Sequence, residues 1–553
     1  MAPPDEAEAA IAELADGARA EPLPDQELTP EILYRMLLAE IASQRGETDL
    51  AITAYSELAK ETRDPRVARR AAEMALFARR NEAALESARL WVELDPESPQ
   101  ARQMLAGILV GTDRLDEIEP HIAKLLSQEG SRLGDGLQRL NRLFARHQDK
   151  RAVWALVDRL TQPYLSVAEA RFARAQAAQA AGDSPRALEE VEAAQSLRAG
   201  WEQAALFKAQ LLQAESATKA LDSLRRFLND YPRARDVRLH YARGLAGEKM
   251  YTEARAEFQR LLKDFPDNPD VILAVAVLSM QLNDPALAES NFKRLLELNQ
   301  GDPNLARIYL GQIAEDRKDL DKALEWYAAV DGGDQFLPAQ IRYANVLGRQ
   351  GKVDDARRHL QELAGKNSRD RMQLLLAEAQ VLRDAGRTRE AFDLLDQQLT
   401  GQPEQPELLY ETALLAEKLG RMEVLEANLR KLIQLKPDHA HAYNALGYSY
   451  ADRNERLEEA QQLITKALQL APEDPFIIDS MGWVLYRKGD LNAALEQLQR
   501  AFSIRKDPEI AAHLGEVLWM MGRKSEANKT WRDASAANPG NEVLVEVMKK
   551  FSH

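Results

Sequence analysis

The 553-residue sequence contains no cysteine. Without cysteine the chain forms no disulfide bond, holds no thiolate-ligated metal and has no cysteine nucleophile. It also lacks any apolar run near the roughly 18 residues that a membrane-spanning helix requires. The 73 basic residues are outnumbered by 88 acidic ones, and the formal net charge of −15 argues against a nucleic-acid partner.

Recognisable catalytic and cofactor-binding motifs are missing as well. The sequence has no phosphate-binding loop, no dinucleotide fingerprint, no nucleophile elbow and no HExxH metalloprotease motif. Of its eight histidines only His439 and His441 lie close together, and their spacing suits a single metal ion poorly. We therefore expect no catalysis, no metal site and no cofactor in this chain.

The sequence does contain a repeated unit, which is clearest near the C-terminus. There Leu514 and Gly515 are followed by Ala527, Trp531 and Pro539. This order matches the two-helix unit of the tetratricopeptide repeat (TPR). We interpret Gly515 and Ala527 as the small residues at which the two helices cross, and Trp531 as the filler beneath the next unit.

The small residue equivalent to Ala527 recurs every 33, 34 or 35 residues along the chain. A glycine lies five residues before this position in seven units, which suits the left-handed turn between two helices. A proline lies twelve residues after it in seven units. Fifteen units in register predict an all-α solenoid superhelix of about fifteen TPR-like helix pairs over residues 29–540. The series is Ala51, Ala84, Ile118, Ala152, Ala187, Ala220, Ala254, Ala288, Ala323, Ala356, Ala391, Leu425, Ala460, Ala494 and Ala527.

Three other segments differ from the repeats. Residues 1–28 are rich in acidic residues and proline, which predicts a flexible tail. A short helix over residues 7–19 would place Ile11 and Leu14 on one side as a docking element for a partner. Residues 541–553 predict an amphipathic capping helix. Within the array, Gly130, Gly134 and Gly136 predict a longer loop.

Helical spacing also indicates which side chains of the first helices line the concave groove of the last units. This band combines aromatic rings with a few polar groups, a composition typical of a protein-binding hot spot. The alternative is that Trp483 and Trp519 only pack between helices. The predicted partner-binding residues are Asn444, Tyr448, Phe476, Asp479, Trp483, Tyr486, Arg487 and Trp519.

The repeat series identifies the chain as a member of the TPR superfamily. With its acidic, cysteine-free leading segment, the array resembles bacterial TPR outer-membrane lipoproteins that serve as adaptors of a periplasmic carboxy-terminal processing protease. This resemblance implies a non-enzymatic scaffold that binds a serine protease and its cell-wall hydrolase substrates and promotes their proteolysis. It further implies a periplasmic location, with a lipid anchor on a cysteine that this sequence does not contain.

Two other functions remain open from the sequence. One is a structural assembly factor of an envelope machine, such as a pilus or a polysaccharide export system. The other is the regulatory half of an enzyme whose catalytic domain lies on another chain. A cytoplasmic location is the alternative to the periplasm. The groove does not repeat the Lys-Asn arrangement with which some TPR domains grip the C-termini of chaperones, which argues against a cochaperone.

Overall fold

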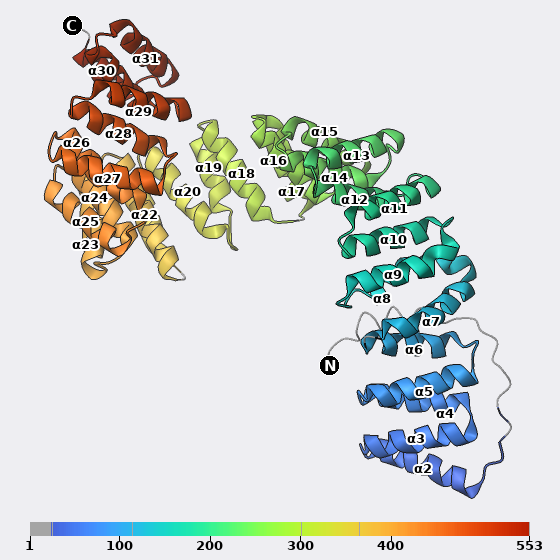
Figure 1. Cartoon of the computed structure of the whole chain (residues 1–553). Helices are drawn as coiled ribbons and strands as arrows, with labels where there is room; N and C mark the ends of the chain where they lie inside the picture. Colours follow the sequence, from blue (N-terminus) through green and yellow to red (C-terminus); the bar gives the residue numbers. More distant parts are fainter. Residues whose placement is uncertain are drawn as a thin grey trace. The chain divides into compact units, whose positions relative to one another are not determined.

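The computed structural model describes residues 24, 26–112, 114–299, 301–363, 365 and 367–551. These described residues form 31 α-helices, α2 to α32, with two short 3-10 helices and no β-strand (Figure 1). The thirty helices α2 to α31 make fifteen consecutive pairs. The prediction of an all-α solenoid of about fifteen helix pairs is therefore confirmed.

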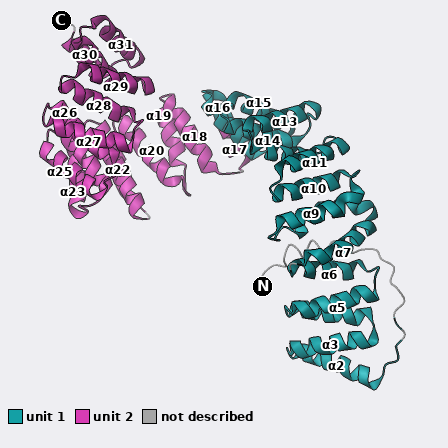
Figure 2. Cartoon of the chain, in the orientation of Figure 1, with its two compact units in different colours: residues 1–291 teal, residues 292–553 magenta. Residues whose placement is uncertain are grey.

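The chain divides into two compact units, residues 1–291 and 292–553 (Figure 2). Helix α17 (Pro285–Leu298) spans the boundary between them. Unit 1 also contains α2 (Pro30–Gln44), α3 (Thr48–Thr62), α4 (Pro65–Phe77), α5 (Asn81–Leu94), α6 (Pro99–Gly111), α7 (Leu115–Gln128), α8 (Leu133–Leu143), α9 (Lys150–Thr161), α10 (Ala168–Ala180), α11 (Ser184–Leu197), α12 (Glu202–Gln213), α13 (Ala217–Asp230), α14 (Arg235–Gly247), α15 (Tyr251–Asp264) and α16 (Pro269–Gln281).

Unit 2 continues the same order of short helices. Helix α32 packs against α30 and α31, at the place where the sequence predicts a capping helix. Unit 2 contains α18 (Pro303–Asp316), α19 (Leu320–Ala328), α20 (Phe336–Arg349), α21 (Val353–Glu362), α22 (Ser368–Asp384), α23 (Thr388–Gly401), α24 (Pro406–Lys418), α25 (Met422–Leu435), α26 (Ala440–Asp452), α27 (Leu457–Leu470), α28 (Pro475–Arg487), α29 (Leu491–Ile504), α30 (Pro508–Met520), α31 (Lys524–Ala537) and α32 (Glu542–Lys550).

The small-residue series lies in the second helix of each pair, and fourteen of its fifteen members lie three residues after the helix begins. Ala254, Ala323 and Ala494 are fully buried there, as the helix crossing requires. In the fourth unit the predicted series residue, Ala152, is wrong. Because Asp149 caps α9 by accepting from the N–H groups of Arg151 and Ala152, the helix begins at Lys150 and the equivalent residue is Val153. Val153 is 4% exposed, whereas Ala152 is only half-buried.

The turns between paired helices confirm the role that the sequence predicts for glycine. All seven glycines five residues before the series position have a positive φ, between 70° and 91°. Where this turn residue is Arg79, Lys249, Asn283 or Lys318, it takes the same left-handed conformation, with φ between 54° and 62°. The helix pair therefore dictates this backbone conformation, and glycine is only the residue that adopts it without strain. The seven glycines are Gly46, Gly182, Gly351, Gly386, Gly420, Gly489 and Gly522.

The sequence prediction of a longer loop at Gly130, Gly134 and Gly136 is wrong. Gly130 begins a single 3-10 turn, and Gly134 and Gly136 lie inside α8. Gly136 is buried there. A Cβ atom at this position would lie 3.3 Å from side-chain atoms of Leu126 and Glu129, which leaves little room for any other residue. Gly136 thus serves a close approach of α7 and α8, whereas a Cβ at Gly134 would lie 3.2 Å from the side chain of Glu169 in α10.

Close crossing of paired helices is most evident in the last unit. A Cβ atom built at Gly515 in α30 would lie 2.0 Å from Nε1 of Trp531 in α31. Trp531 is 1% exposed and its Nε1 donates to the main-chain oxygen of Ala512 at 3.2 Å. The predicted need for a glycine at residue 515 is therefore confirmed.

Candidate protein-binding surface

The candidate surface is built from consecutive first helices of unit 2. Helix α26 packs against both α24 and α28, and α28 packs against α30 (Figure 1). Side chains cap the starts of α28 and α30: Asp474 accepts from the N–H groups of Phe476 and Ile477, and Asp507 accepts from that of Glu509. Equivalent positions on these helices therefore lie beside one another across successive units.

Four rings from three of these helices form a contiguous group, which we call the aromatic cluster: Tyr448, Trp483, Tyr486 and His513. The rings of Trp483 and His513 stack, with centroids 4.2 Å apart and planes inclined by 24°. Trp483 also packs against Tyr486 at 5.1 Å, and Tyr448 lies 6.1 Å from His513. The guanidinium of Arg487 lies 5.8 Å from the centre of the Trp483 ring.

A buried ion pair supports the cluster from within. Nδ1 of His513 donates to Oδ2 of Asp479 at 2.9 Å. Burial by itself lowers the pKa of His513, but the charge of Asp479 and this hydrogen bond outweigh burial, so the pKa of His513 is raised. The imidazolium is therefore favoured, and its charge is offset by the carboxylate of Asp479.

A second polar contact ties the cluster to the C-terminal helix. The hydroxyl of Tyr486 donates to Oε1 of Glu516 at 3.1 Å, and Nζ of Lys550 in α32 donates to the same oxygen at 2.9 Å. Burial, and then the charge of Glu516, raise the pKa of Tyr486 to about 12. Tyr486 is thus a neutral hydrogen-bond donor whose ring remains half-buried at the edge of the cluster.

The structure brings together most, but not all, of the residues that the sequence predicts as partner-binding. Asn444, Tyr448 and Arg487 are half-buried on α26 and α28. Phe476 lies near the start of α28, with the guanidinium of Arg505 5.2 Å from its ring centre. Trp519 belongs to a different stack, described next. Ile11 and Leu14 lie outside the described residues.

Trp519 is part of the packing at the end of unit 2. Its ring lies 6.0 Å from that of Trp531 and 5.6 Å from that of Phe551. Nζ of Lys524 lies 4.7 Å from the centre of its ring. Trp519 is half-buried, so one part fills the packing of α30, α31 and the residue after α32, and another part remains accessible.

Comparison with known proteins agrees with this architecture. Tetratricopeptide repeat family models match residues 210–269, 245–310, 343–400 and 425–475. The chain is 34% identical over 508 residues to the TPR repeat-containing protein PA4667 of Pseudomonas aeruginosa, a match that covers 92% of this chain and 85% of that protein. The chain belongs to the tetratricopeptide-repeat family.

Other relatives and a solved structure match over shorter lengths. Cellulose synthase 2 operon protein C of Komagataeibacter xylinus is 25% identical over 53% of this chain and 21% of that protein. Human mitochondrial import receptor subunit TOM70 is 24% identical over 42% of this chain and 34% of the receptor. A solved thermophilic TPR protein of Thermus thermophilus is 25% identical, with a TM-score of 0.31 over 33% of this chain and 99% of that structure.

His513 is a member of the aromatic cluster that the helical spacing of the groove residues does not include. It lies 34 residues after Asp479, which is one repeat length. Residues one repeat apart lie on adjacent first helices, so this spacing was a usable signal. The link between Glu516 and Lys550 depends on the position of α32, which the repeat spacing does not give.

Metal binding and membrane spanning can also be judged from the described residues. Among these residues no three His, Asp or Glu side chains come together in a way that could hold a metal ion. Within the same residues no helix combines the length and apolar character needed to cross a bilayer. TPR proteins are in general non-enzymatic scaffolds that bind other proteins.

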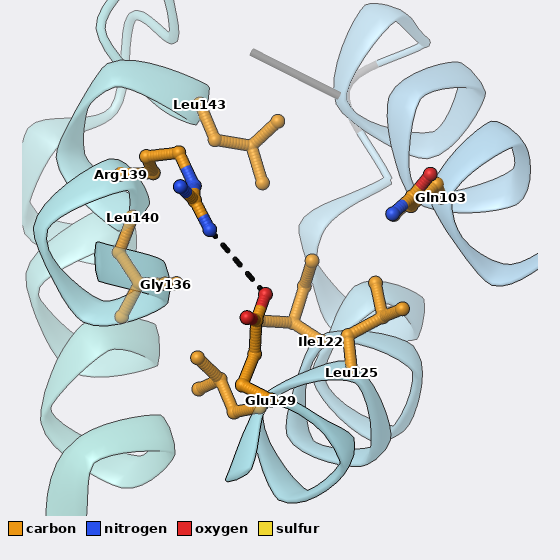
Figure 3. A pocket seen from close by; sticks show the side chains of 10 residues that line it. Gln103, Ile122, Leu125, Glu129, Gly136, Arg139, Leu140 and Leu143 are labelled. Carbon is orange, nitrogen blue, oxygen red and sulfur yellow. Dashed lines mark hydrogen bonds and ion pairs between the residues drawn. The ribbon is translucent and has the colours of Figure 1, made fainter. Parts of the chain in front are cut away.

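A small cavity lies within unit 1 between α6, α7 and α8 (Figure 3). Its volume is about 50 Å³, and its walls are mostly apolar. Nη2 of Arg139 donates to Oε1 of Glu129 across it at 3.4 Å. A space of this size holds a few water molecules, at roughly 10–15 Å³ each, rather than the side chain of a partner. We therefore do not regard it as the binding site.

Helix α2 presents an apolar face at the N-terminal end of unit 1. Leu33, Tyr34, Leu37 and Ile41 are between 43% and 62% exposed. Every later first helix in the TPR array follows a second helix of the preceding pair, but no described helix precedes α2. This face is a second candidate contact surface.

Proposed function

We propose that this chain is an adaptor without catalytic activity that binds a periplasmic carboxy-terminal processing serine protease and its cell-wall hydrolase substrates. In this proposal it promotes their proteolysis, as the lipoprotein LbcA, which its sequence resembles, does for the protease CtpA. The proposal includes a periplasmic location and attachment to the outer membrane through a lipid anchor.

The observation that supports a scaffold most directly is the aromatic cluster on adjacent first helices. Tyr448, Tyr486 and Arg487 are half-buried beside a stacked tryptophan, and aromatic residues and arginine are the residue types enriched in protein hot spots. Fifteen helix pairs also supply separate surfaces for a protease and a substrate. The similarity to a Pseudomonas TPR protein over 92% of this chain supports a bacterial scaffold of the same kind.

The test combines the purified chain, a carboxy-terminal processing protease and a cell-wall hydrolase. We expect the chain alone to cleave neither protein nor cell-wall polymer, and to accelerate cleavage of the hydrolase when the protease is present. Hydrolysis by the chain alone that survives repurification would overturn the adaptor proposal, as would unchanged protease activity.

Variants then locate the partner contact. Trp483 is 5% exposed, so its truncation would disturb packing as well as binding. The paired change Tyr448→Ala and Arg487→Ala removes more accessible atoms and should weaken partner binding by about 30-fold, the equivalent of 2 kcal/mol. The matched control is Ile504→Ala, an exposed apolar residue at the end of α29. Equal binding by both folded variants would remove the cluster from the proposed interface.

The N-terminal tail is the second element of this proposal. The tail would tether the array to the membrane, and its segment 7–19 would dock through Ile11 and Leu14 when a partner binds. The exposed apolar face of α2 follows the tail in sequence and supports a partner contact in this region. A variant with Ile11→Asp and Leu14→Asp should activate the protease less than the intact chain. Full activation by this variant and by a deletion of residues 1–28 would leave the tail as a spacer only.

A second candidate function is a structural assembly factor of a polysaccharide export system. The similarity to cellulose synthase 2 operon protein C supports it, although only 21% of that protein is matched. Retrieval from envelope extracts separates the two candidates: a protease is expected for the adaptor, and export-machine subunits are expected for the assembly factor.

A further inference from the structure

A groove within unit 1 crosses three consecutive first helices, α8, α10 and α12. Its volume is about 290 Å³, near the lower limit of roughly 300 Å³ for ligand pockets, whereas the cavity between α6, α7 and α8 holds only about 50 Å³. Five of its nine lining residues have amide side chains, so hydrogen-bonding groups dominate its surface. We call it the amide groove, after Gln138, Asn141, Gln176, Gln179 and Gln203.

The amides share the groove because their spacing follows the helices. Gln138 and Asn141 are three residues apart on α8 and therefore lie on one face of that helix. The same spacing separates Gln176 from Gln179 on α10, and Gln203 lies in the first turn of α12. Gln179 and Gln203 are exposed and the other three are half-buried, so all five are accessible to a partner.

Side-chain contacts join the three helices along the groove. Nδ2 of Asn141 donates to the main-chain oxygen of Ala173 at 2.8 Å and to Oε1 of Gln176 at 3.1 Å, which links α8 to α10. The rings of Phe172 and Phe207 meet edge-on with centroids 5.4 Å apart, which links α10 to α12. Phe172 is 1% exposed and forms part of the floor, whereas the ring of Phe207 is half-buried.

Most hydrogen-bonding groups of these amides remain available. The side chains of Gln138, Gln179 and Gln203 make no hydrogen bond to any described residue. The bond between Asn141 and Gln176 uses a donor of the first and the oxygen of the second, so Oδ1 of Asn141 and Nε2 of Gln176 stay open within the described part of the chain. Because an amide offers both donors and an acceptor, each of the three helices presents both kinds of group.

We propose that the amide groove binds the main chain of an extended segment of a partner polypeptide. The amides donate to C=O groups of the segment and accept from its N–H groups, and one of its apolar side chains covers the open part of Phe207. This inference rests on the proposed function, because it assumes that the chain receives polypeptides, and it adds the conformation in which unit 1 holds a substrate.

The dimensions of the groove suit an extended chain. Packed helices lie about 8–10 Å apart, and an extended chain rises about 3.3 Å per residue. Amides on neighbouring first helices therefore meet main-chain groups about three residues apart, and three helices span a segment of about six residues. Since every residue has these main-chain groups, the groove accepts segments of different sequence, as a scaffold with several substrates requires.

Hydrogen-bonding capacity and charge decide between this occupant and the alternatives. The apolar face of a partner helix would cover the amides without satisfying them, which is unfavourable. A nucleic acid is bound through several cations, but Arg142 is the one charged residue among those that line the groove. A main chain brings a donor and an acceptor in every residue, and so matches amides that offer both.

The experiment measures binding of fluorescein-labelled peptides to the full chain by fluorescence anisotropy. Two capped seven-residue peptides have the same alternating serine and valine side chains, and one of them is N-methylated at alternate residues. We expect the unmethylated peptide to bind saturably and the methylated one about tenfold more weakly, because it lacks N–H donors. A third peptide with the same residues in another order should bind about as well as the first.

Variants locate the binding. Gln179→Met with Gln203→Met removes two exposed amides while keeping side-chain length, and should weaken peptide binding about tenfold. The matched control is Gln162→Met with Gln259→Met, which changes two exposed glutamines of unit 1 outside the groove. Equal binding of the methylated and unmethylated peptides, or equal effects of the two variants, would overturn the inference. Binding of chitohexaose in place of the peptides would assign the groove to a glycan instead.

The outcomes also separate this inference from the function on which it rests. Binding of the unmethylated peptide in the groove by a chain that activates no protease would keep the main-chain site and reject the protease adaptor. Protease activation by a chain that does not distinguish the two peptides would keep the adaptor and reject this site.

Discussion

Replacing Gly515 by alanine tests whether close crossing of paired helices governs the stability of the array. The added Cβ would lie 2.0 Å from Nε1 and 2.3 Å from Cε2 of Trp531. Favourable carbon contacts need about 3.5 Å, so the indole or the helix must move by more than about 1 Å. Trp531 cannot move freely, because it is 1% exposed and stacked on Phe551, with ring centroids 5.6 Å apart.

The expected cost follows from the contacts that this movement breaks. Overpacking of a well-packed core costs about 1–3 kcal/mol. Displacing the Trp531 ring also breaks its 3.2 Å hydrogen bond to Ala512, and an unsatisfied buried donor costs about 1–3 kcal/mol more. Alanine returns roughly 1 kcal/mol through its better helix propensity. We expect a net destabilisation of about 3 kcal/mol in the last unit.

Hydrogen exchange resolves this loss, since a repeat array does not unfold as one two-state body. Amides of α30 and α31 in the Gly515→Ala variant should exchange roughly a hundredfold faster than in the unchanged chain. The matched control is Gly401→Ala, at the last residue of α23, where a Cβ meets nothing within 4 Å. Unchanged exchange in α30 and α31, or the same loss in the control, would refute the close-crossing argument.

Three further predictions concern packing, backbone conformation and pH. Ala254→Leu should lower stability by about 1–3 kcal/mol, whereas Ala152→Leu, at a half-buried position, should change the thermal midpoint little; equal effects would contradict the corrected register. Lys249→Gly should stabilise its unit by about 1 kcal/mol in urea unfolding, because glycine adopts φ 60° without strain, and a loss of stability would contradict this reasoning. Because the pKa of His513 is raised by folding, its stabilising contribution is complete below the unfolded value of about 6.5 and is lost as pH rises through the folded pKa. The difference in urea midpoint between the unchanged chain and His513→Gln should therefore shrink with rising pH, and a constant difference would count against a protonated His513.

Much of this fold follows from the spacing of small residues, because each unit repeats one physical requirement. Two helices can cross closely only where one side chain is small, and the turn between them needs a left-handed residue. Fourteen of the fifteen predicted series positions fall three residues into a helix for that reason. The fifteenth, Ala152, fails because the helix start is set by the cap at Asp149, which the repeat period does not reveal. Gly134 and Gly136 misled for a related reason, since glycine permits close helix contact as well as loops.

The candidate surface was harder to predict, because its properties depend on pairs of side chains from different units. Helical spacing placed Tyr448, Trp483 and Tyr486 on one side of the array, and the structure joins them through His513. Spacing did not show that Trp483 is almost enclosed. Its burial arises from the stack with His513, one unit further on, and so depends on the distance between adjacent units rather than on the period of one helix.

The Asp479–His513 pair is not explained by the requirements of the fold. A repeat array is stabilised by small residues at crossings and apolar fillers beneath them, and neither role needs a buried charge. Leaving one oxygen of Asp479 unpaired opposes stability by about 1–3 kcal/mol, and apolar residues at both positions would remove that cost. Local departures of this kind occur mostly where a protein binds or reacts. Because the departure lies on α28 and α30 within the aromatic cluster, the residues that weaken the array belong to the surface that we propose binds a partner.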